Sequence, residues 1–413
     1  MNSLEKNNIP AGYKESAVGI IPQEWEVATL GKLVSIASGE SPSLFHLRSI
    51  GKYPYIKVED MNNCEKYQAD SREYTDDERV VIAKGSIIFP KRGAAITNNK
   101  VRIAACQLYM DSNMMAITPN DLVCGDYLYF KITYEQLFRI ADTSTIPQIN
   151  NKHIIPYKIC LPPLKEQRKI AEILGVWDEA IEKQSRLIEK LELRKRGLMQ
   201  RLLTGRTRLP GFTSPWQKVK LGEIGKFDKG VGVPKEKIVS EGCKAITYGE
   251  IYTKYDYVIK DFASYIDSDT AQTSKQISSG AIIFAGSGET LEDIGKCVAF
   301  IDNDKAYAGG DIIIFNPSIE VDSLVLSYIL NSPIVIAQKR RYGQGHSVVH
   351  IYQKDLARIE FELPSLPEQK AIAEVLTTAD KEIATHRKKL DALRLQKRGL
   401  MQQLLTGKTR VKI

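Results

Sequence analysis

Residues 161–209 read LPPLKEQRKIAEILGVWDEAIEKQSRLIEKLELRKRGLMQRLLTGRTRL, and residues 363–411 read LPSLPEQKAIAEVLTTADKEIATHRKKLDALRLQKRGLMQQLLTGKTRV. The two stretches align without a gap at an offset of 202, and 25 of the 49 positions are identical. A period of about 200 residues indicates a duplicated domain, because the repeats of solenoid proteins run to some tens of residues.

Each repeated stretch predicts one long helix. Prolines stand before it, and Gly205 and Gly407 stand after it, as is typical of helix ends. Apolar residues recur every three or four positions for roughly five heptads. A helix of about 39 residues spans roughly 58 Å at about 1.5 Å per residue. Because one face of each helix is apolar, we expect the two copies to pack on each other.

Two equivalent helices of one chain pair most simply about a pseudo-two-fold axis, so we expect an antiparallel, coiled-coil-like pair. Gln184 and His386 are equivalent positions near the centre of the repeat. One interpretation is that these polar residues face each other and fix the register of the pair. The alternative is that both point to solvent at the edge of the apolar stripe.

The parts before and between the long helices predict smaller domains of mixed structure. Residues 1–160 and 210–362 contain short β-rich runs, separated by turns rich in Gly, Asn, Asp and Pro, and a few helical patches. The fold class is therefore α+β, with two α/β domains (1–160 and 210–362) and two helical spacers (161–209 and 363–413). The expected strands are Tyr53–Val58, Ser86–Phe89, Ala281–Phe284 and Asp311–Phe315, and the expected helices are Asp126–Phe138 and Val321–Arg341.

Composition excludes several classes of protein. The 413 residues are 43% hydrophobic and 26% charged, with a net charge of +8, which excludes a disordered tail, a collagen and a disulfide miniprotein. The charge belongs to the helices, since residues 161–209 hold 12 Lys and Arg against 7 Asp and Glu, and residues 363–411 hold 10 against 5. The six cysteines form no C-x-x-C pair, and the first residues lack an apolar leader segment. We expect a cytoplasmic protein.

A search for catalytic and cofactor motifs finds none that is convincing. Gly407-Lys408-Thr409 resembles the end of a P-loop but closes a helix, and the G-x-G pairs lack the third glycine of a dinucleotide fingerprint. The Asn/Asp-Pro-Pro-aromatic tetrapeptide of amino-methyltransferases is absent from the sequence. His346 and His350 have the spacing of helical zinc ligands, but no acidic residue or cysteine completes a set. We therefore expect no metal site and no active site.

Three loops carry side chains suited to reading DNA. Arg, Lys and Asn form bidentate contacts with purine edges, while Glu, Ser and Thr suit other bases. Two loops with different residues, at equivalent places in a duplicated domain, predict an asymmetric site in two halves. The residues are Lys91, Arg92, Asn98, Asn99 and Lys100 in the first copy, Ser287, Glu289 and Thr290 in the second, and Lys339, Arg340, Arg341, Gln344 and His346 in a basic segment.

The repeated motifs resemble the specificity (S) subunit of type I restriction–modification systems. The resemblance is carried by Leu-Pro-Pro-Leu-x-Glu-Gln at 161–167, by its second copy at 363–369, and by Lys-Arg-Gly-Leu-Met-Gln-x-Leu-Leu-Thr-Gly at 195–205 and 397–407. It extends to Ile21-Pro-x-x-Trp25 and to the strand and loop at 85–93, and so covers nearly the whole chain.

The resemblance implies a non-catalytic subunit in which each variable part is a target recognition domain. Two methyltransferase (M) subunits would dock on the helices, restriction (R) subunits would join, and S-adenosylmethionine, ATP and Mg would be bound by those partners. We also expect Lys57 to contribute to DNA binding. Positions expected to pair the helices and dock partners are Glu166, Gln167, Ile170, Leu174, Trp177, Ile181, Gln184, Leu191, Leu198, Glu368, Gln369, Ile372, Leu376, Ile383, His386, Leu393 and Leu400.

Two other functions remain open from the sequence. A self-contained DNA-modifying enzyme would require a cofactor motif that the search does not find. A scaffold that binds only proteins would retain its DNA affinity, if it has any, after charge reversal at Lys91 and Arg92, whereas a DNA-reading subunit would lose sequence preference in one half of its site.

Overall fold

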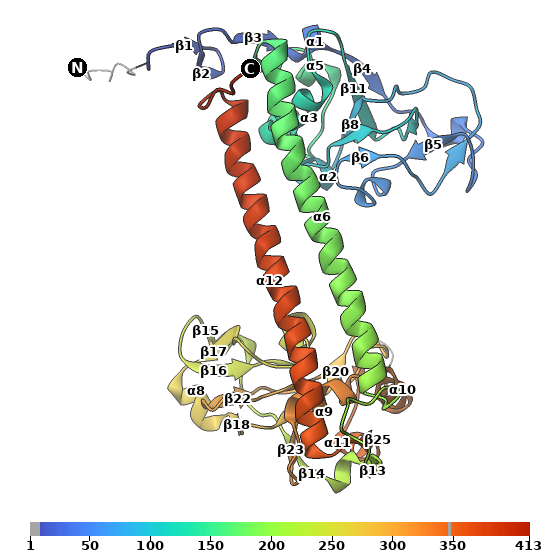
Figure 1. The fold of residues 1–413 in the computed structure, drawn as a ribbon, viewed down its shortest axis with the longest axis vertical. Coiled ribbons are helices and arrows are strands. Elements are labelled where there is room, and N and C mark those ends of the chain that lie inside the picture. Colours follow the sequence, from blue (N-terminus) through green and yellow to red (C-terminus); the bar gives the residue numbers. More distant parts are fainter. Residues whose placement is uncertain (1–8, 346–347) are drawn as a thin grey trace. The chain divides into compact units, whose positions relative to one another are not determined.

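The computed structural model describes residues 9–345 and 348–413 (Figure 1). The chain divides into two compact units, which we call unit 1 (Met1–Leu187 and Arg387–Ile413) and unit 2 (Ile188–His386). Both boundaries fall inside the two long helices, α6 (Leu164–Leu202) and α12 (Leu366–Leu405), so each unit contains one half of each helix. The domain borders expected at 160, 209 and 362 remain predictions.

Unit 1 is built from short strands and helices around two sheets. The five-stranded sheet has the order β4-β11-β8-β9-β6, the three-stranded sheet has the order β10-β5-β7, and two further pairs are β12-β3 and β1-β2. The strands are β1 (Tyr13–Ser16), β2 (Gly19–Pro22), β3 (Glu26–Thr29), β4 (Val34–Ser38), β5 (Tyr53–Ile56), β6 (Tyr67–Gln68), β7 (Tyr74–Thr75), β8 (Ile87–Pro90), β9 (Arg102–Ala104), β10 (Tyr109–Met110), β11 (Met114–Pro119) and β12 (Lys158–Leu161). The short helices are α1 (Leu30–Leu33), α2 (Ala94–Thr97), α3 (Gly125–Glu135), α4 (Leu137–Ile140) and α5 (Asn151–Ile154).

Unit 2 has the same kinds of elements. Its sheets have the orders β14-β23-β19-β21 and β15-β17-β16-β22-β18, with the additional pairs β13-β25 and β20-β24. The strands are β13 (Gln217–Lys220), β14 (Gly225–Lys229), β15 (Ile238–Val239), β16 (Cys243–Ile246), β17 (Ser264–Ile266), β18 (Lys275–Ile277), β19 (Ile282–Ala285), β20 (Ser287–Gly288), β21 (Cys297–Ala299), β22 (Ala306–Ala308), β23 (Ile312–Pro317), β24 (Val349–His350) and β25 (Glu360–Leu363). The helices are α7 (Tyr248–Thr253), α8 (Ser268–Thr273), α9 (Ser323–Leu330), α10 (Pro333–Tyr342) and α11 (Gln353–Leu356).

The two units repeat one framework. The order β4-β11-β8-β9 of unit 1 matches the order β14-β23-β19-β21 of unit 2, strand for strand in chain sequence. The register repeats as well, because β12 pairs Lys158 with Thr29, and β25 pairs Glu360 with Lys220, at offsets of 202 and 191. The predicted duplication and the mixed α and β content are therefore confirmed.

The expected strands and helices are present, with two breaks that the periodicity did not indicate. The expected helix Asp126–Phe138 is divided into α3 and α4, because Gln136 adopts a left-handed conformation with φ of +66°. The expected helix Val321–Arg341 is divided into α9 and α10, because Pro333 cannot continue the first helix and instead begins the second.

The long helices α6 and α12 contain 39 and 40 residues, close to the expected length. After α6, Gly205 takes a left-handed conformation with φ of +65°, and after α12, Gly407 does so with φ of +72°. A Cβ on Gly407 would lie 2.5 Å from the Cδ atom of Pro22, so this position has no room for a side chain.

Each unit encloses parts of both long helices in its hydrophobic core. In unit 1, Ile170 and Leu174 of α6 and Leu404 of α12 lie in one buried cluster with Trp25. The corresponding cluster of unit 2 includes residues at and just after the end of α6, residues near the beginning of α12, and residues of α9; they are Leu202, Leu203, Ile372, Leu376, Val325 and Leu326. The helices are therefore integral to each unit and not appended to it.

Candidate nucleic-acid interface

A buried glutamate anchors the beginning of α6 in unit 1. The Nε1 atom of Trp25 donates a hydrogen bond to Glu166 Oε2 at 3.0 Å, and Arg410 Nε donates to Glu166 Oε1 at 2.6 Å. Glu166 is fully buried, so its two oxygens need these donors. The cluster joins the entry of unit 1, the first turn of α6 and the segment after α12.

Unit 2 contains the same cluster at the beginning of α12. Trp216 Nε1 donates to Glu368 Oε2 at 3.0 Å, and Arg208 Nε donates to Glu368 Oε1 at 2.6 Å. The three residues correspond to those of unit 1 along the repeat. The sequence indicated the glutamates but not their tryptophan and arginine partners, although all of them recur in both copies.

The glutamine after each glutamate also bonds within its own unit. The side chain of Gln167 donates to the carbonyl of Pro162 and accepts from the amide of Cys124, each at 2.8 Å. Gln369 makes the matching contacts with Pro364 and Asp322, also at 2.8 Å. A partner-docking role for Glu166, Gln167, Glu368 and Gln369 is therefore wrong, because these side chains are buried; their role in helix pairing rests on the arginine contacts above.

A second set of ion pairs aligns the helices in opposite directions. In unit 2, Lys195 Nζ lies 2.5 Å from Asp380 Oδ1, and Tyr328 donates to the other oxygen of Asp380 at 2.6 Å. In unit 1, Lys397 pairs with Asp178 in the same way. The paired residue numbers rise in one helix as they fall in the other, which confirms the antiparallel arrangement.

The other helix positions predicted to pair the helices or dock partners differ in how far they are buried. Ile170, Leu174, Ile372 and Leu376 are buried in the core of their own unit, which leaves their side chains unavailable to a partner. Gln184 is buried as well, which contradicts the alternative that it points to solvent, whereas its pairing with His386 stays a prediction. Leu191 and Ile383 are buried, and partly buried positions are Trp177, Ile181, His386, Leu198, Leu393 and Leu400.

The predicted base-reading loop of unit 1 begins where β8 ends. The amide of Lys91 donates to the carbonyl of Asn113 at 2.8 Å, and the carbonyl of Lys91 accepts from the amide of Ile149 at 2.9 Å. These bonds hold the start of the loop between two neighbouring segments. Arg92 follows immediately and is exposed.

The loop of unit 2 begins in the same way after β19. The amide of Gly286 donates to Asp311 at 2.7 Å, and its carbonyl accepts from Ile351 at 2.9 Å. A Cβ on Gly286 would meet the carbonyl oxygen of Asp311 at 2.9 Å. A common backbone therefore presents Lys and Arg in one unit and Gly and Ser in the other.

Within the loop of unit 1, the predicted residues differ in availability. Arg92 and Asn98 are exposed, whereas burial and the neighbouring charge of Arg92 lower the pKa of Lys91. Asn99 is engaged inside the unit, since its side chain donates to the carbonyl of Thr133 at 2.8 Å and accepts from the amide of Leu137 at 2.9 Å. The amide of Asn99 thus connects α2 to α3 and α4, and base contact by Asn99 stays a prediction.

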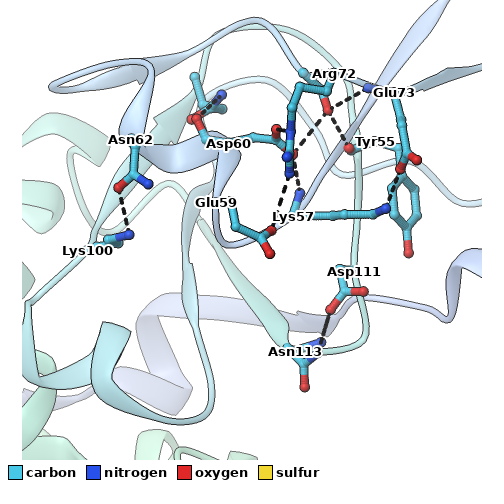
Figure 2. A network of polar contacts seen from close by, with 12 residues as sticks. Tyr55, Lys57, Glu59, Asp60, Asn62, Arg72, Glu73, Lys100, Asp111 and Asn113 are labelled. Carbon is cyan, nitrogen blue, oxygen red and sulfur yellow. Dashed lines mark hydrogen bonds and ion pairs between the residues drawn. The ribbon is translucent and has the colours of Figure 1, made fainter. Parts of the chain in front are cut away.

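Figure 2 shows the polar network around Lys57 and Lys100. Lys57 Nζ lies 2.5 Å from Glu73 Oε2, and Lys100 Nζ donates to Asn62 Oδ1 at 2.7 Å. Both lysines are partly buried and have partners, so a phosphate or a base would have to replace an existing contact.

Beside them, buried Asp60 organises the loop of unit 1 that carries Arg72. Asp60 accepts from the amide of Lys57 at 2.9 Å and from Arg72 Nε at 2.7 Å. Sequence reasoning missed this pair, whose members lie twelve positions apart on separate turns.

Two predicted residues of unit 2 are buried. Lys339 is 1% exposed, and its Nζ donates to the carbonyl of Gly295 at 2.6 Å. Burial lowers the pKa of Lys339, which lies in α10, inside the expected helix Val321–Arg341. Ser287 is buried with its hydroxyl 2.9 Å from His350 Nδ1. Direct DNA contact is therefore wrong for both side chains.

The remaining predicted residues of unit 2 lie on connected surface segments. Arg340 and Arg341 are exposed in the last turn of α10, and Glu289, Thr290 and Gln344 are exposed as well. The backbone of residue 344 bonds to that of residue 350, which in turn pairs with residue 287 in the β20–β24 ladder. This ladder brings the acidic loop and the Gly-rich segment together. His346 lies outside the described residues.

Neither a metal site nor a membrane span is found in the described part of the chain. Within residues 9–345 and 348–413, no group of three or more His, Cys, Asp or Glu side chains is placed to hold a metal ion. Among those same residues, no helix has the length and apolar content needed to cross a bilayer.

Comparison with known proteins agrees with this architecture. The specificity subunit of type I restriction enzyme MjaVIII from Methanocaldococcus jannaschii is 25% identical over 427 residues, which cover 97% of this chain and 96% of that protein. The MjaIX specificity subunit of the same organism is 27% identical over 305 residues, which cover 68% of this chain and 70% of that protein.

Solved structures with the same fold include the S subunit of a type I restriction–modification system from M. genitalium (TM-score 0.57, 17% identity, 97% of this chain and 98% of that chain). A chain from a type I R-M system has a TM-score of 0.61 at 17% identity, over 94% of this chain and 99% of that chain. The family model described as type I restriction modification DNA specificity domain matches twice, at residues 22–193 and 213–395. The chain therefore belongs to the family of type I restriction–modification DNA specificity proteins.

Proposed function

We propose that this chain is the subunit that gives a type I restriction–modification complex its DNA sequence specificity. Unit 1 reads one half of a bipartite site, and unit 2 reads the other half. The observation that carries this proposal is the repeated backbone at Lys91 and Gly286, which presents different side chains from one framework. Because the two loops differ, the two half-sites differ.

The loops supply a few local contacts and not a broad cationic surface. Arg92 and Asn98 in unit 1, and Glu289, Arg340 and Gln344 in unit 2, are exposed side chains of the kinds that read base edges or hold phosphates. Most of the net positive charge resides on the repeated helices. We therefore expect weak DNA affinity for the isolated chain, with partner subunits supplying much of the phosphate contact.

We propose that the chain performs no catalysis. Two methyltransferase subunits dock on the repeated helices and modify adenine with S-adenosylmethionine, and restriction subunits supply the ATP- and Mg-dependent cleavage. Each methyltransferase receives its adenine extruded from the stack, as base-modifying enzymes require. Methyl transfer by the purified chain alone would contradict this assignment and favour the self-contained enzyme.

The direct test is genome-wide mapping of methyladenine in cells with and without the gene. We expect one asymmetric split sequence to lose its methylation when the gene is deleted. If the methylation pattern does not change, the proposed function is wrong.

Arg92→Ala is expected to relax sequence preference in one half-site only. A lost bidentate contact costs about 1–3 kcal/mol of discrimination at the base concerned. The measurement is binding of the assembled methyltransferase complex to duplexes with single base changes in each half-site. Arg168→Ala removes an exposed arginine from α6 and serves as the matched control, with no expected change in preference. A uniform loss at all sequences would instead identify Arg92 as a phosphate contact.

A further inference from the structure

A second segment lies beside each predicted base-reading loop, at the turn that leads into the neighbouring strand. In unit 1 this turn is residues 111–113, which precede β11, and in unit 2 it is residues 309–311, which precede β23. The two strands correspond at an offset of 198, since each has six residues and ends in proline. Asn113 and Asp311 therefore occupy the same position of the repeated framework.

The sheet register places this position directly opposite the first residue of each loop. One step beyond the last pair of β8 and β11, the amide of Lys91 donates to the carbonyl of Asn113 at 2.8 Å. One step beyond the last pair of β19 and β23, the amide of Gly286 donates to the carbonyl of Asp311 at 2.7 Å. Both Asn113 and Asp311 are exposed, so each presents its side chain at the root of a predicted base-reading loop.

In unit 1 the amide group of Asn113 has a fixed orientation (Figure 2). Its Nδ2 donates to Asp111 Oδ1 at 2.8 Å, and the same oxygen accepts from the backbone amide of Asn113 at 2.7 Å. A carboxylate can only accept, so the nitrogen of the amide faces Asp111. The second N–H and the carbonyl oxygen have no partner among the described residues. They form the donor and acceptor pair that matches N7 and the N6 amino group of adenine.

In unit 2 a carboxylate stands at the same place without such support. Within the described part of the chain, no side-chain hydrogen bond or ion pair engages Asp311. Gly309 takes the place of Asp111, and a Cβ there would lie 3.2 Å from the Cβ of Val233. A carboxylate presents acceptors however it rotates, so it needs no orienting neighbour. These acceptors suit the amino group of cytosine, whereas the N7 atom of a purine would repel them.

The residue opposite each side chain agrees with this reading. Lys91 stands opposite an amide, which it cannot neutralise, and Gly286 places no side chain beside Asp311. An aspartate opposite Lys91 would form an ion pair and lose its acceptors to the chain itself. Asp311 also has a φ of +57°, which is uncommon outside glycine. An exposed carboxylate at such a backbone position, with no contact in its own unit, indicates a ligand outside the chain.

We propose that Asn113 reads an adenine in one half-site and that Asp311 reads a cytosine in the other, an inference that rests on the proposed function. Asp111 is a positioning residue, because it acts through the amide of Asn113. The contacts use the major-groove edges of paired bases. The adenine read by Asn113 is therefore distinct from the adenine that is extruded for methylation.

A phosphate is a less suitable ligand for this position. Phosphate contacts come from cations and neutral donors. Asp311 would repel a phosphate, so the position cannot make the same backbone contact in both units. A difference between the two copies is what base reading requires, since the half-sites differ.

The test is selection of binding sequences from randomised duplexes by the assembled methyltransferase complex. We expect Asp311→Asn to replace a preference for cytosine by one for adenine at a single position of the unit 2 half-site. Asn113→Ala should lower the preference for one adenine of the unit 1 half-site, and each change should be about tenfold or more. Asn303→Asp is the control, because Asn303 is exposed in the turn after β21, at the end of that strand remote from the loop. This control should keep every preference.

A modified base separates base reading from an effect on folding. 7-Deazaadenine lacks the N7 acceptor, so at the adenine read by Asn113 it should weaken wild-type binding several-fold and leave binding by Asn113→Ala unaffected. Asp111→Ala should lower the same adenine preference. Asp111→Asn should retain it, because the amide oxygen can accept both hydrogen bonds.

The outcomes distinguish this inference from the proposed function. Unchanged preferences in both Asn113→Ala and Asp311→Asn would overturn the inference and leave the proposed function intact. An equal loss of affinity for all sequences would show a phosphate contact or a folding defect and would also overturn it. A wild-type complex without sequence preference would overturn both.

Discussion

Replacement of Glu166 with alanine is expected to lower the stability of unit 1 by about 3 kcal/mol, near the lower end of the range for breaking a buried ion pair. The change leaves the buried Nε1 of Trp25 without an acceptor and removes the carboxylate that both holds and neutralises Arg410. We place the effect at the lower end because the Arg410 side chain is one-third exposed. Glu368→Ala should do the same to unit 2.

Hydrogen exchange read by mass spectrometry can locate the effect, since each unit then serves as the control for the other. Glu166→Ala should accelerate exchange in unit 1 and leave unit 2 unchanged, and Glu368→Ala should show the reverse. Glu172→Ala is a matched control, because Glu172 is exposed and its partner is Lys169 on the same helix. Exchange that rises equally in both units would contradict an anchor confined to one of them.

The repeat made the helices and the duplication predictable, because helical periodicity is a local property that survives without tertiary information. It also marked Glu166 as a repeated residue. Its role was not predictable, since Trp25 and Arg410 lie 141 and 244 positions away in the sequence. We interpreted a buried anchor as a docking surface because the same repeated motif fits both roles.

The loop residues were harder to predict, and Lys339 shows the reason. The segment after Pro333 has the spacing of a helix, and Lys339 follows the buried Val335 by four positions, so both lie on one face. The expected helix Val321–Arg341 already included Lys339, but the run of basic residues favoured an exposed position for it. Asn99 gave no comparable signal, because its contacts depend on where α3 and α4 end. The exposed side chains that we propose to read bases have no periodic pattern at all.

Lys131→Met is expected to cost unit 1 about 3 kcal/mol at neutral pH, whereas Lys339→Met should cost unit 2 little. Both lysines are buried, but their partners differ. Lys131 Nζ lies 2.8 Å from a carboxylate oxygen of Glu135 and 3.1 Å from the carbonyl of Leu405. Removal of Lys131 leaves the carboxylate of Glu135 without its cationic partner. Lys339 instead donates to a carbonyl, and no carboxylate among the described residues pairs with it.

The two lysines should also respond to pH in opposite ways. Burial alone lowers the pKa of Lys131, but the Cys160 thiol and Glu135 outweigh it and raise that pKa above its ordinary value of 10.5. The stability from Lys131 is therefore fully present below pH 10.5 and is lost as the pH rises through the folded-state pKa. Burial lowers the pKa of Lys339, so its contribution is greatest above pH 10.5 and declines as the pH falls through the folded-state pKa.

Urea unfolding of the wild type and both methionine variants between pH 7 and pH 10 measures this difference. The cost of Lys131→Met should stay constant over the range, and the cost of Lys339→Met should grow with pH.

The same Lys339 variant tests the corrected assignment, since a lost phosphate contact would reduce the slope of log affinity against log salt by about one. Because Lys339 is buried, we expect Lys339→Met to leave that slope unchanged in the assembled complex. Arg340→Met is the comparison, because Arg340 is an exposed cation of the same helix and its loss can change the slope.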